Sequence, residues 1–254
     1  VWHNCRCVGW LKFQQHSHHD SYYYFKLSMT DLERLVLQHL SQFVSDHKKE
    51  FVEKVLNART RNITVVLEDI FQSQNASAVI RTCECMGIQD VHIVENITKY
   101  SINPRVLKGS NKWIDIVLHR SKAKNNTETV LRGLKDDGYK VLVTDPGTDG
   151  ISIEDINVQE KIALVFGNEL RGISKEASSL CDQKVRIPMY GFTESLNISV
   201  SVAICLNTIL TKIHSREAFV GLNDIEKEFL KLKWYRKIVR KSDLIEREFL
   251  RTIE

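Results

Sequence analysis

The chain has 254 residues, which is enough for one average-to-large domain with helical extensions. Hydrophobic and charged contents of 43% and 27% are ordinary for a globular protein, and no apolar stretch reaches the roughly 20 residues that a membrane span needs. The net charge of +4 is too small to indicate a nucleic-acid partner by itself, although it permits one. We therefore expect a soluble protein without membrane association.

Residues 1 to 28 differ from the rest of the chain. Histidines and tyrosines crowd together there without a helical or strand period, and the segment lacks the apolar core of a secretory signal. We expect this leader to be disordered or not native, with Met29 as the natural start. A metal site at His16, His18 and His19 is the alternative.

The six cysteines do not have the spacing of a zinc site. Cys5 and Cys7, like Cys83 and Cys85, are separated by one residue, whereas zinc-binding pairs are usually separated by roughly two to four. The sequence therefore indicates free thiols in a reducing cytoplasm, and we expect no metal. A disulfide framework is the alternative.

A helical arm over residues 29 to 60 is expected to precede the main domain. Thr30 is a good N-cap, and apolar residues then recur at helical spacing in two pieces, the second beginning near Phe51.

Strands alternate with helices through residues 61 to 214, which predicts an α/β domain with a mainly parallel sheet and helices on both faces. The expected strands are residues 62–67, 91–94, 114–118, 139–144, 161–166 and 184–187. The expected helices are residues 75–86, 127–135, 173–180 and 196–213. Ser195 is the expected N-cap of the last helix. Residues 95–112 form a long polar loop, and loops of that length usually have a function.

The C-terminal extension, residues 215 to 254, is predicted to contain two helices, one of them basic on one face. Six basic residues and no acidic residue occur from Lys231 to Lys241. At helical spacing, those that share one face are Lys233, Arg236, Lys237, Arg240 and Lys241. We interpret the first four as contacts to RNA phosphates. A solvated face on a helix packed against the core is the alternative.

Three segments at predicted strand ends contain candidate site residues, in the place where open α/β sheets bind ligands. The first contains Asn75 and Arg81 in the helix after the first strand. Considered alone, Asn75 could cap a helix and Arg81 could form an ion pair with Glu84.

The other two segments are residues 166–172 and 187–206. In the second segment a strand breaks at Gly167 and the carboxylate of Glu169 follows. In the third, a loop leads to Ser195 and then to Asn197, at the polar mouth of an apolar helix. Each segment is weak evidence alone, but their combination in this order is strong.

In that combination the sequence closely resembles the SPOUT superfamily of RNA methyltransferases, and within it the TrmH-type tRNA (guanosine-2'-O-)-methyltransferases. The matching stretches are residues 75–81, 164–174 and 187–200. The resemblance extends over residues 29 to 254 and leaves the leader without a counterpart. It implies a deep C-terminal trefoil knot, which is a rare exception to unknotted connections, and an obligate homodimer.

The resemblance also implies S-adenosyl-L-methionine bound in the knot. The implied cofactor contacts, largely backbone groups and an apolar slot for adenine, are Thr144, Gly167, Ile187, Met189 and Leu196. The implied catalytic residues are Asn75, Arg81, Glu169, Ser195 and Asn197. The implied reaction is attack of a ribose 2'-hydroxyl of RNA, expected to be that of the D-loop guanosine of tRNA, on the methyl carbon of a sulfonium.

Arg81 is a poor base because the pKa of a guanidinium exceeds about 12. We interpret it as binding the neighbouring phosphate and stabilising developing alkoxide charge, with proton removal by a partner or water. Asn75 would hold Arg81 or the RNA backbone.

Three other functions compete with this one. Ribosomal RNA is the alternative substrate, because related enzymes share the catalytic motifs. A non-catalytic RNA-binding SPOUT module is disfavoured because Arg81, Glu169 and Asn197 are intact. A dinucleotide oxidoreductase needs a glycine-rich turn after the first strand, and residues 68–74 contain no glycine.

Overall fold

The computed structural model of the protein describes residues 29–122, 125–147 and 149–253. The strands are β1 Ile63–Glu68, β2 Asp90–Val94, β3 Asp115–His119, β4 Tyr139–Thr144, β5 Ile151–Ser152, β6 Lys161–Phe166 and β7 Gln183–Arg186. The α-helices are α1 Asp31–Ser41, α2 Asp46–Asn57, α3 Ser73–Cys85, α4 Pro104–Leu107, α5 Asn126–Asp136, α6 Lys175–Leu180, α7 Ile198–Ser215, α8 Asp224–Ile238 and α9 Ser242–Ile253. The predicted leader lies outside the described residues.

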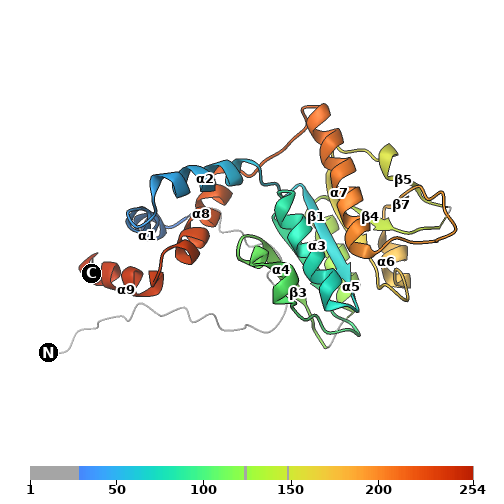
Figure 1. The fold of residues 1–254 in the computed structure, drawn as a ribbon, viewed down its shortest axis with the longest axis horizontal. Coiled ribbons are helices and arrows are strands. Elements are labelled where there is room, and N and C mark those ends of the chain that lie inside the picture. Colours follow the sequence, from blue (N-terminus) through green and yellow to red (C-terminus); the bar gives the residue numbers. More distant parts are fainter. Residues whose placement is uncertain (1–28, 123–124, 148, 254) are drawn as a thin grey trace.

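The strands form one seven-stranded sheet in the order β3-β2-β1-β6-β4-β7-β5, and every pairing is parallel. Because side chains alternate along a strand, β1 supplies both cores: Val65 and Leu67 pack with α3 and α7, and Val66 packs with α5. Helices therefore cover both faces of the sheet (Figure 1), and the predicted α/β architecture is confirmed.

The structure differs from the predicted elements in three places. The loop over residues 95–112 contains the short helix α4, in which Pro104 supplies a preset first turn, and a 3₁₀ turn at Ser110–Lys112. Strand β5 was not predicted, because a two-residue strand is too short to show a period. Helix α7 begins at Ile198 with Asn197, not Ser195, as its N-cap, because the Asn197 side chain accepts the Ser199 backbone N–H.

The two ends of the described chain pack together as a helical unit beside the sheet domain (Figure 1). Val36 of α1, Leu56 of α2 and Trp234 of α8 belong to one buried cluster that is separate from the two cores of the sheet. The predicted arm and C-terminal helices therefore form one packed layer and not two independent extensions.

Helix α7 is the one helix within the described ranges that is long and apolar enough to cross a membrane, by length and composition only. Its Val202, Leu206 and Ile209 are fully buried in the core with α3. A core helix has the same composition, so this is weak evidence for a span.

Candidate active site

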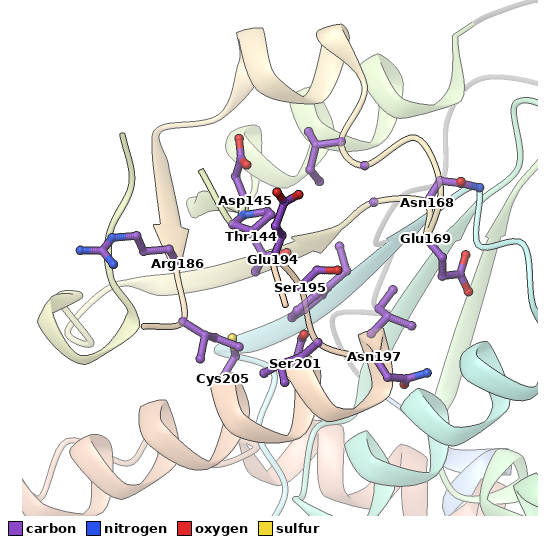
Figure 2. Close-up of a pocket in the computed structure, with 18 of the residues that line it drawn as sticks. Thr144, Asp145, Asn168, Glu169, Arg186, Glu194, Ser195, Asn197, Ser201 and Cys205 are labelled. Atoms are coloured by element: carbon purple, nitrogen blue, oxygen red, sulfur yellow. The ribbon is translucent and has the colours of Figure 1, made fainter. Parts of the chain in front are cut away.

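A cavity of about 680 Å³ opens at the carboxyl ends of β4, β6 and β7. Its walls are the connections that follow these strands, together with the N-terminal ends of α3 and α7 (Figure 2). This is where parallel sheets bind ligands, and the volume lies within the usual range of about 300 to 1,000 Å³ for ligand pockets. The topology therefore gives the chain one preformed ligand site at the predicted edge of the sheet.

Nine of the ten predicted cofactor and catalytic residues line this cavity. The five cofactor-contact residues among them are Thr144, Gly167, Ile187, Met189 and Leu196. The four catalytic candidates among them are Asn75, Glu169, Ser195 and Asn197. The structure thus brings the first segment together with two others that follow it by more than 90 residues in the chain.

Glu169, Asn75 and Asn197 form a continuous hydrogen-bond network at one end of the cavity. Oε1 of Glu169 accepts a bond from Nδ2 of Asn75 at 2.8 Å, and Oδ1 of Asn75 accepts one from Nδ2 of Asn197 at 3.1 Å. The Glu169 carboxylate also accepts the backbone N–H groups of Phe71 at 2.8 Å and Gln72 at 3.3 Å. Figure 2 shows Glu169 and Asn197 on this side of the pocket. The network ties the starts of α3 and α7 to the loop after β6.

The network favours the ionised form of Glu169. Burial raises the pKa of the carboxyl group, but the hydrogen bonds from Asn75 and from the Phe71 and Gln72 amides outweigh burial, so the pKa lies below its ordinary value. An ionised carboxylate accepts bonds but donates none. Glu169 is therefore suited to hold its neighbours in place and not to supply a proton.

The loop that holds Glu169 is closed by two glycines. A Cβ at Gly167 would lie 2.3 Å from the carbonyl oxygen of Gly172, and Gly172 has φ of +68°, which side chains rarely tolerate. The backbones of Asn168 and Gly172 exchange two hydrogen bonds, at 2.9 and 2.8 Å, which close the loop. The side chain of Asn168 donates to the carbonyl oxygen of Asp69 at 2.6 Å, which joins the loop to the end of β1. The carboxylate is thereby fixed from both sides.

Arg81 is the predicted catalytic residue that does not line the cavity. At 100° per residue, it lies roughly 120° around α3 from Asn75. Four residues before it, Ser77 accepts the backbone N–H of Asn103 at 2.9 Å, so Arg81 lies on the side of α3 that carries the residues leading into α4. Arg81 is exposed and forms no ion pair with any residue in the described ranges.

The alternative of an Arg81–Glu84 ion pair is not seen. Glu84 instead pairs with the buried Arg59 at 2.7 Å. Because the nearest carboxylate on α3 is already occupied, the Arg81 guanidinium remains available to a ligand outside the cavity.

The basic residues of the C-terminal extension do not form one continuous helical face. Helix α8 ends at Ile238, so Arg240 lies in the turn before α9. Lys233 pairs with Asp115, and Arg236 pairs with Glu246 through bonds of 2.6 and 2.9 Å. Lys237 donates to the carbonyl oxygen of Lys112. The prediction of a single basic face is therefore wrong. Lys233 and Arg236 are ion-paired, whereas Lys237 and Arg240 have no carboxylate partner among the described residues.

Several cavity residues were not predicted. Asp145 directly follows β4 and also lines the pocket, so the strand-end position that singled out Thr144 also applied to it. Arg186, Glu194 and Gln72 line the cavity as well. The contact of Gln72 with Glu169 runs through its backbone N–H, and a backbone contact leaves no signal in residue type.

The lining fits the cofactor that the sequence predicts. Ile187, Met189 and Leu196 supply an apolar wall, and Gly167 lines the cavity with backbone groups alone. Asp145 adds a polar group at the carboxyl end of β4. An apolar slot with a few fixed polar groups suits a heteroaromatic ring attached to a polar chain.

Residues 62–207 match the sequence model of the SpoU rRNA Methylase family. The chain belongs to this family, and the predicted resemblance is confirmed.

The relatives include tRNA (guanosine(18)-2'-O)-methyltransferases. That of Borreliella burgdorferi is 46% identical over 207 residues, which is 82% of this chain and 93% of the relative. That of Thermus thermophilus is 31% identical over 162 residues, which is 64% of this chain and 81% of the relative.

Solved structures agree with this assignment. The crystal structure of the A. aeolicus TrmH/SpoU tRNA-modifying enzyme matches with a TM-score of 0.67 and 26% identity, over 82% of this chain and all of that one. The Streptomyces viridochromogenes SpoU methyltransferase AviRb, in complex with AdoMet, matches with a TM-score of 0.53 and 21% identity over 64% of each chain, which supports the fold alone.

Proposed function

We propose that the protein transfers a methyl group from S-adenosyl-L-methionine to the ribose 2'-hydroxyl of the guanosine at position 18 in the D-loop of tRNA. The observation that carries the proposal is the Glu169–Asn75–Asn197 network at the mouth of the cavity, which joins all three family segments. A non-catalytic module would have no need to keep this polar set assembled. Ribosomal RNA, named in the family's description, is the alternative substrate.

The cofactor would be held in the cavity by Ile187, Met189 and Leu196 around its adenine, and by backbone groups near Thr144 and Gly167. It supplies a methyl group made electrophilic by a sulfonium. Ser195 lines the same cavity and is exposed, so its hydroxyl is available to cofactor or ribose.

The protein's own residues position the nucleotide. Glu169 fixes Asn75, and Asn75 in turn fixes Asn197, so that the starts of α3 and α7 keep their separation when RNA binds. Arg81, outside the cavity, binds a backbone phosphate of the RNA and so holds the target nucleotide in place. Because a guanidinium has no acceptor site, water or a partner group accepts the proton of the 2'-hydroxyl.

We propose a homodimer as the working form. Tyr190 is 96% exposed, and Phe192 and Val200 beside the same cavity are exposed as well. Apolar side chains gathered at one site of a soluble chain are typical of an interface. Sedimentation equilibrium tests this: a monomer at micromolar concentration would contradict it, and Val200→Glu should weaken the dimer.

We also propose that the chain is knotted and that residues 29–60, 61–214 and 215–254 act as arm, methyltransferase domain and basic extension. Strand β7 lies between β4 and β5, which are close in the chain, and this insertion supports a trefoil knot. A crystal structure traced through residues 139–213 tests the knot. We place the protein in the cytoplasm, where it would meet tRNA, and cell fractionation tests that placement.

Among the basic side chains of the extension, we propose that Lys237 and Arg240 are the stronger contacts to tRNA phosphates. Lys233 and Arg236 already have carboxylate partners, which phosphates would have to displace. Exposed ion pairs contribute little stability, so a phosphate can replace the carboxylate partner, but the net gain in tRNA affinity is smaller than for an unpaired side chain.

The test is methyl transfer itself. The protein is incubated with labelled S-adenosyl-L-methionine and either bulk tRNA or rRNA, and the 2'-O-methylated nucleotide is mapped. We expect label in tRNA at the D-loop guanosine, with Arg81→Ala as the inactive control. Label in rRNA alone would reassign the substrate, and no label in either RNA would refute the activity.

A further inference from the structure

We propose that the side chain of Phe71 is a stacking platform for the base of the target nucleotide. The inference rests on the proposed function and adds a residue that positions the substrate. Phe71 lies in the connection from β1 to α3, where its side chain is 61% exposed. Nearby on the same connection, Ile70 is buried in the main core, so the chain could have turned an apolar ring inward and did not.

The backbone of Phe71 is held firmly although its ring is exposed. The Glu169 carboxylate accepts the N–H groups of Phe71 and Gln72, two consecutive residues, through separate oxygens. Two residues earlier, Asp69 adopts φ of +50°, and its carbonyl oxygen accepts a 2.6 Å bond from Asn168. A ring on such a support is preorganised, so a ligand that binds to it would not have to order the loop.

The position of the ring is the second argument. Phe71 is bound through its amide to Glu169, whose next neighbour, Leu170, is 80% exposed. Two exposed apolar residues are thus attached to the carboxylate that Asn75 contacts, Phe71 through its amide and Leu170 as the next residue in the chain. Neither residue lines the cavity itself, so we infer that the ring borders its edge, next to the place where the ribose must enter.

The chemistry of the occupant follows from the reaction. A ribose 2'-hydroxyl can reach the cavity only if its nucleotide leaves the packed RNA, and its base then loses stacking partners. Proteins that bind unpaired nucleotides usually replace that stacking with an aromatic ring. An aromatic ring stacks on every base, so Phe71 would add affinity and orientation without selecting guanine.

Phe71→Ala tests the inference, with Phe71→Trp as the conservative variant. Phe51→Ala on α2 is the matched control, because Phe51 is 60% exposed but lies in the helical arm. We expect Phe71→Ala to lower kcat/KM for tRNA by about 5- to 150-fold, the range for loss of one stacked base, while calorimetric affinity for S-adenosyl-L-methionine stays unchanged. Phe71→Trp should restore turnover, and Phe51→Ala should match the parent.

A fluorescent base gives a direct reading of stacking. With 2-aminopurine at the methylated position of the tRNA, binding to the parent and to Phe71→Trp should quench the fluorescence relative to Phe71→Ala. Parent-like kinetics in Phe71→Ala would overturn the inference, and so would a loss of activity that tracks dissociation of a dimer in sedimentation. If the parent itself methylates no RNA, the proposed function fails first, and the inference falls with it.

Discussion

At the scale of single residues, the site divides into a part inside the cavity and a part outside it. Asn75 and Arg81 are both on α3, yet one is 8% exposed beside Glu169 and the other is fully at the surface. Their spacing of six residues produces this separation, because it rotates the second side chain roughly 120° around the helix. Cofactor and RNA functions can therefore be separated by mutation.

Arg81→Ala should abolish methyl transfer and leave the affinity for S-adenosyl-L-methionine within a few-fold of the parent. The reason is that Arg81 does not line the cavity but is available to a phosphate. Calorimetry beside a turnover assay measures both quantities. Normal turnover in this variant would remove Arg81 from the mechanism.

Asn197→Ala should weaken cofactor binding and turnover together. Its Nδ2 donates to Asn75, and its Oδ1 accepts the Ser199 N–H at 2.9 Å as the N-cap of α7. Each lost bond should cost on the order of 1 to 3 kcal/mol, and the cap loss should also lower the melting temperature. Asn197→Asp keeps the cap oxygen and serves as the control. Unchanged cofactor affinity in Asn197→Ala would assign Asn197 a structural role only.

At the scale of elements, the sequence predicts long periodic segments well. It does not predict features that depend on contacts between segments distant in the chain. Strands 139–144 and 161–166 have the predicted bounds, because a run of buried apolar residues defines them. The start of α7 was misplaced because Ser195 and Asn197 are both good caps, and the choice depends on the bond from Asn197 to Asn75 in another segment. The basic face was misjudged for a similar reason: the partners of Lys233 and Arg236 are distant in the chain or on the next helix.

The two halves of the basic set should therefore respond differently to substitution. Lys237→Gln with Arg240→Gln should raise KM for tRNA and flatten its salt dependence, because phosphate contacts release counterions. Lys233→Gln with Arg236→Gln should change KM less and lower the melting temperature only slightly, because exposed ion pairs are worth little and Asp115 keeps Arg61 as a partner. The methylated position should stay the same in both, because phosphate contacts do not read bases. Equal salt slopes in all variants would place the RNA elsewhere on the surface.

At the scale of the whole molecule, charged residues join the helical unit to the sheet domain. Arg59 is buried between Glu84 of α3 and the ring of Trp234 on α8, whose centroid is 5.6 Å from the guanidinium carbon. Arg61, just before β1, pairs with Asp115 of β3 at 2.8 Å and with Glu226 of α8 at 3.4 Å. These contacts span 25 or more residues, so no local pattern in the sequence indicated them. The buried side chain of Arg59 thus connects α3, the helix that carries Arg81, to α8 of the proposed RNA-binding extension.

A buried histidine pair in the same sheet should make the stability of the molecule depend on pH. Nδ1 of His92 lies 2.9 Å from Nε2 of His119 on neighbouring strands. Burial lowers the pKa of His92 to about 4, and burial together with the charge of His92 lowers that of His119 to about 3. Both values lie below the ordinary value of about 6.5, so the unfolded chain binds more protons than the folded one from pH 6.5 down to these values.

The free energy of unfolding should therefore fall as the pH drops below about 6.5, by up to about 1.4 kcal/mol per pH unit for each histidine. Burial raises the pKa of Asp90 to about 6, which acts in the opposite direction below pH 6, so the difference between variant and parent is the informative quantity. Denaturant unfolding from pH 7.5 to 5 should show a shallower acid slope for His119→Gln than for the parent. The exposed control His47→Gln should keep the parent slope. An acid slope in His119→Gln equal to that of the parent would show that the pair does not stay neutral on folding.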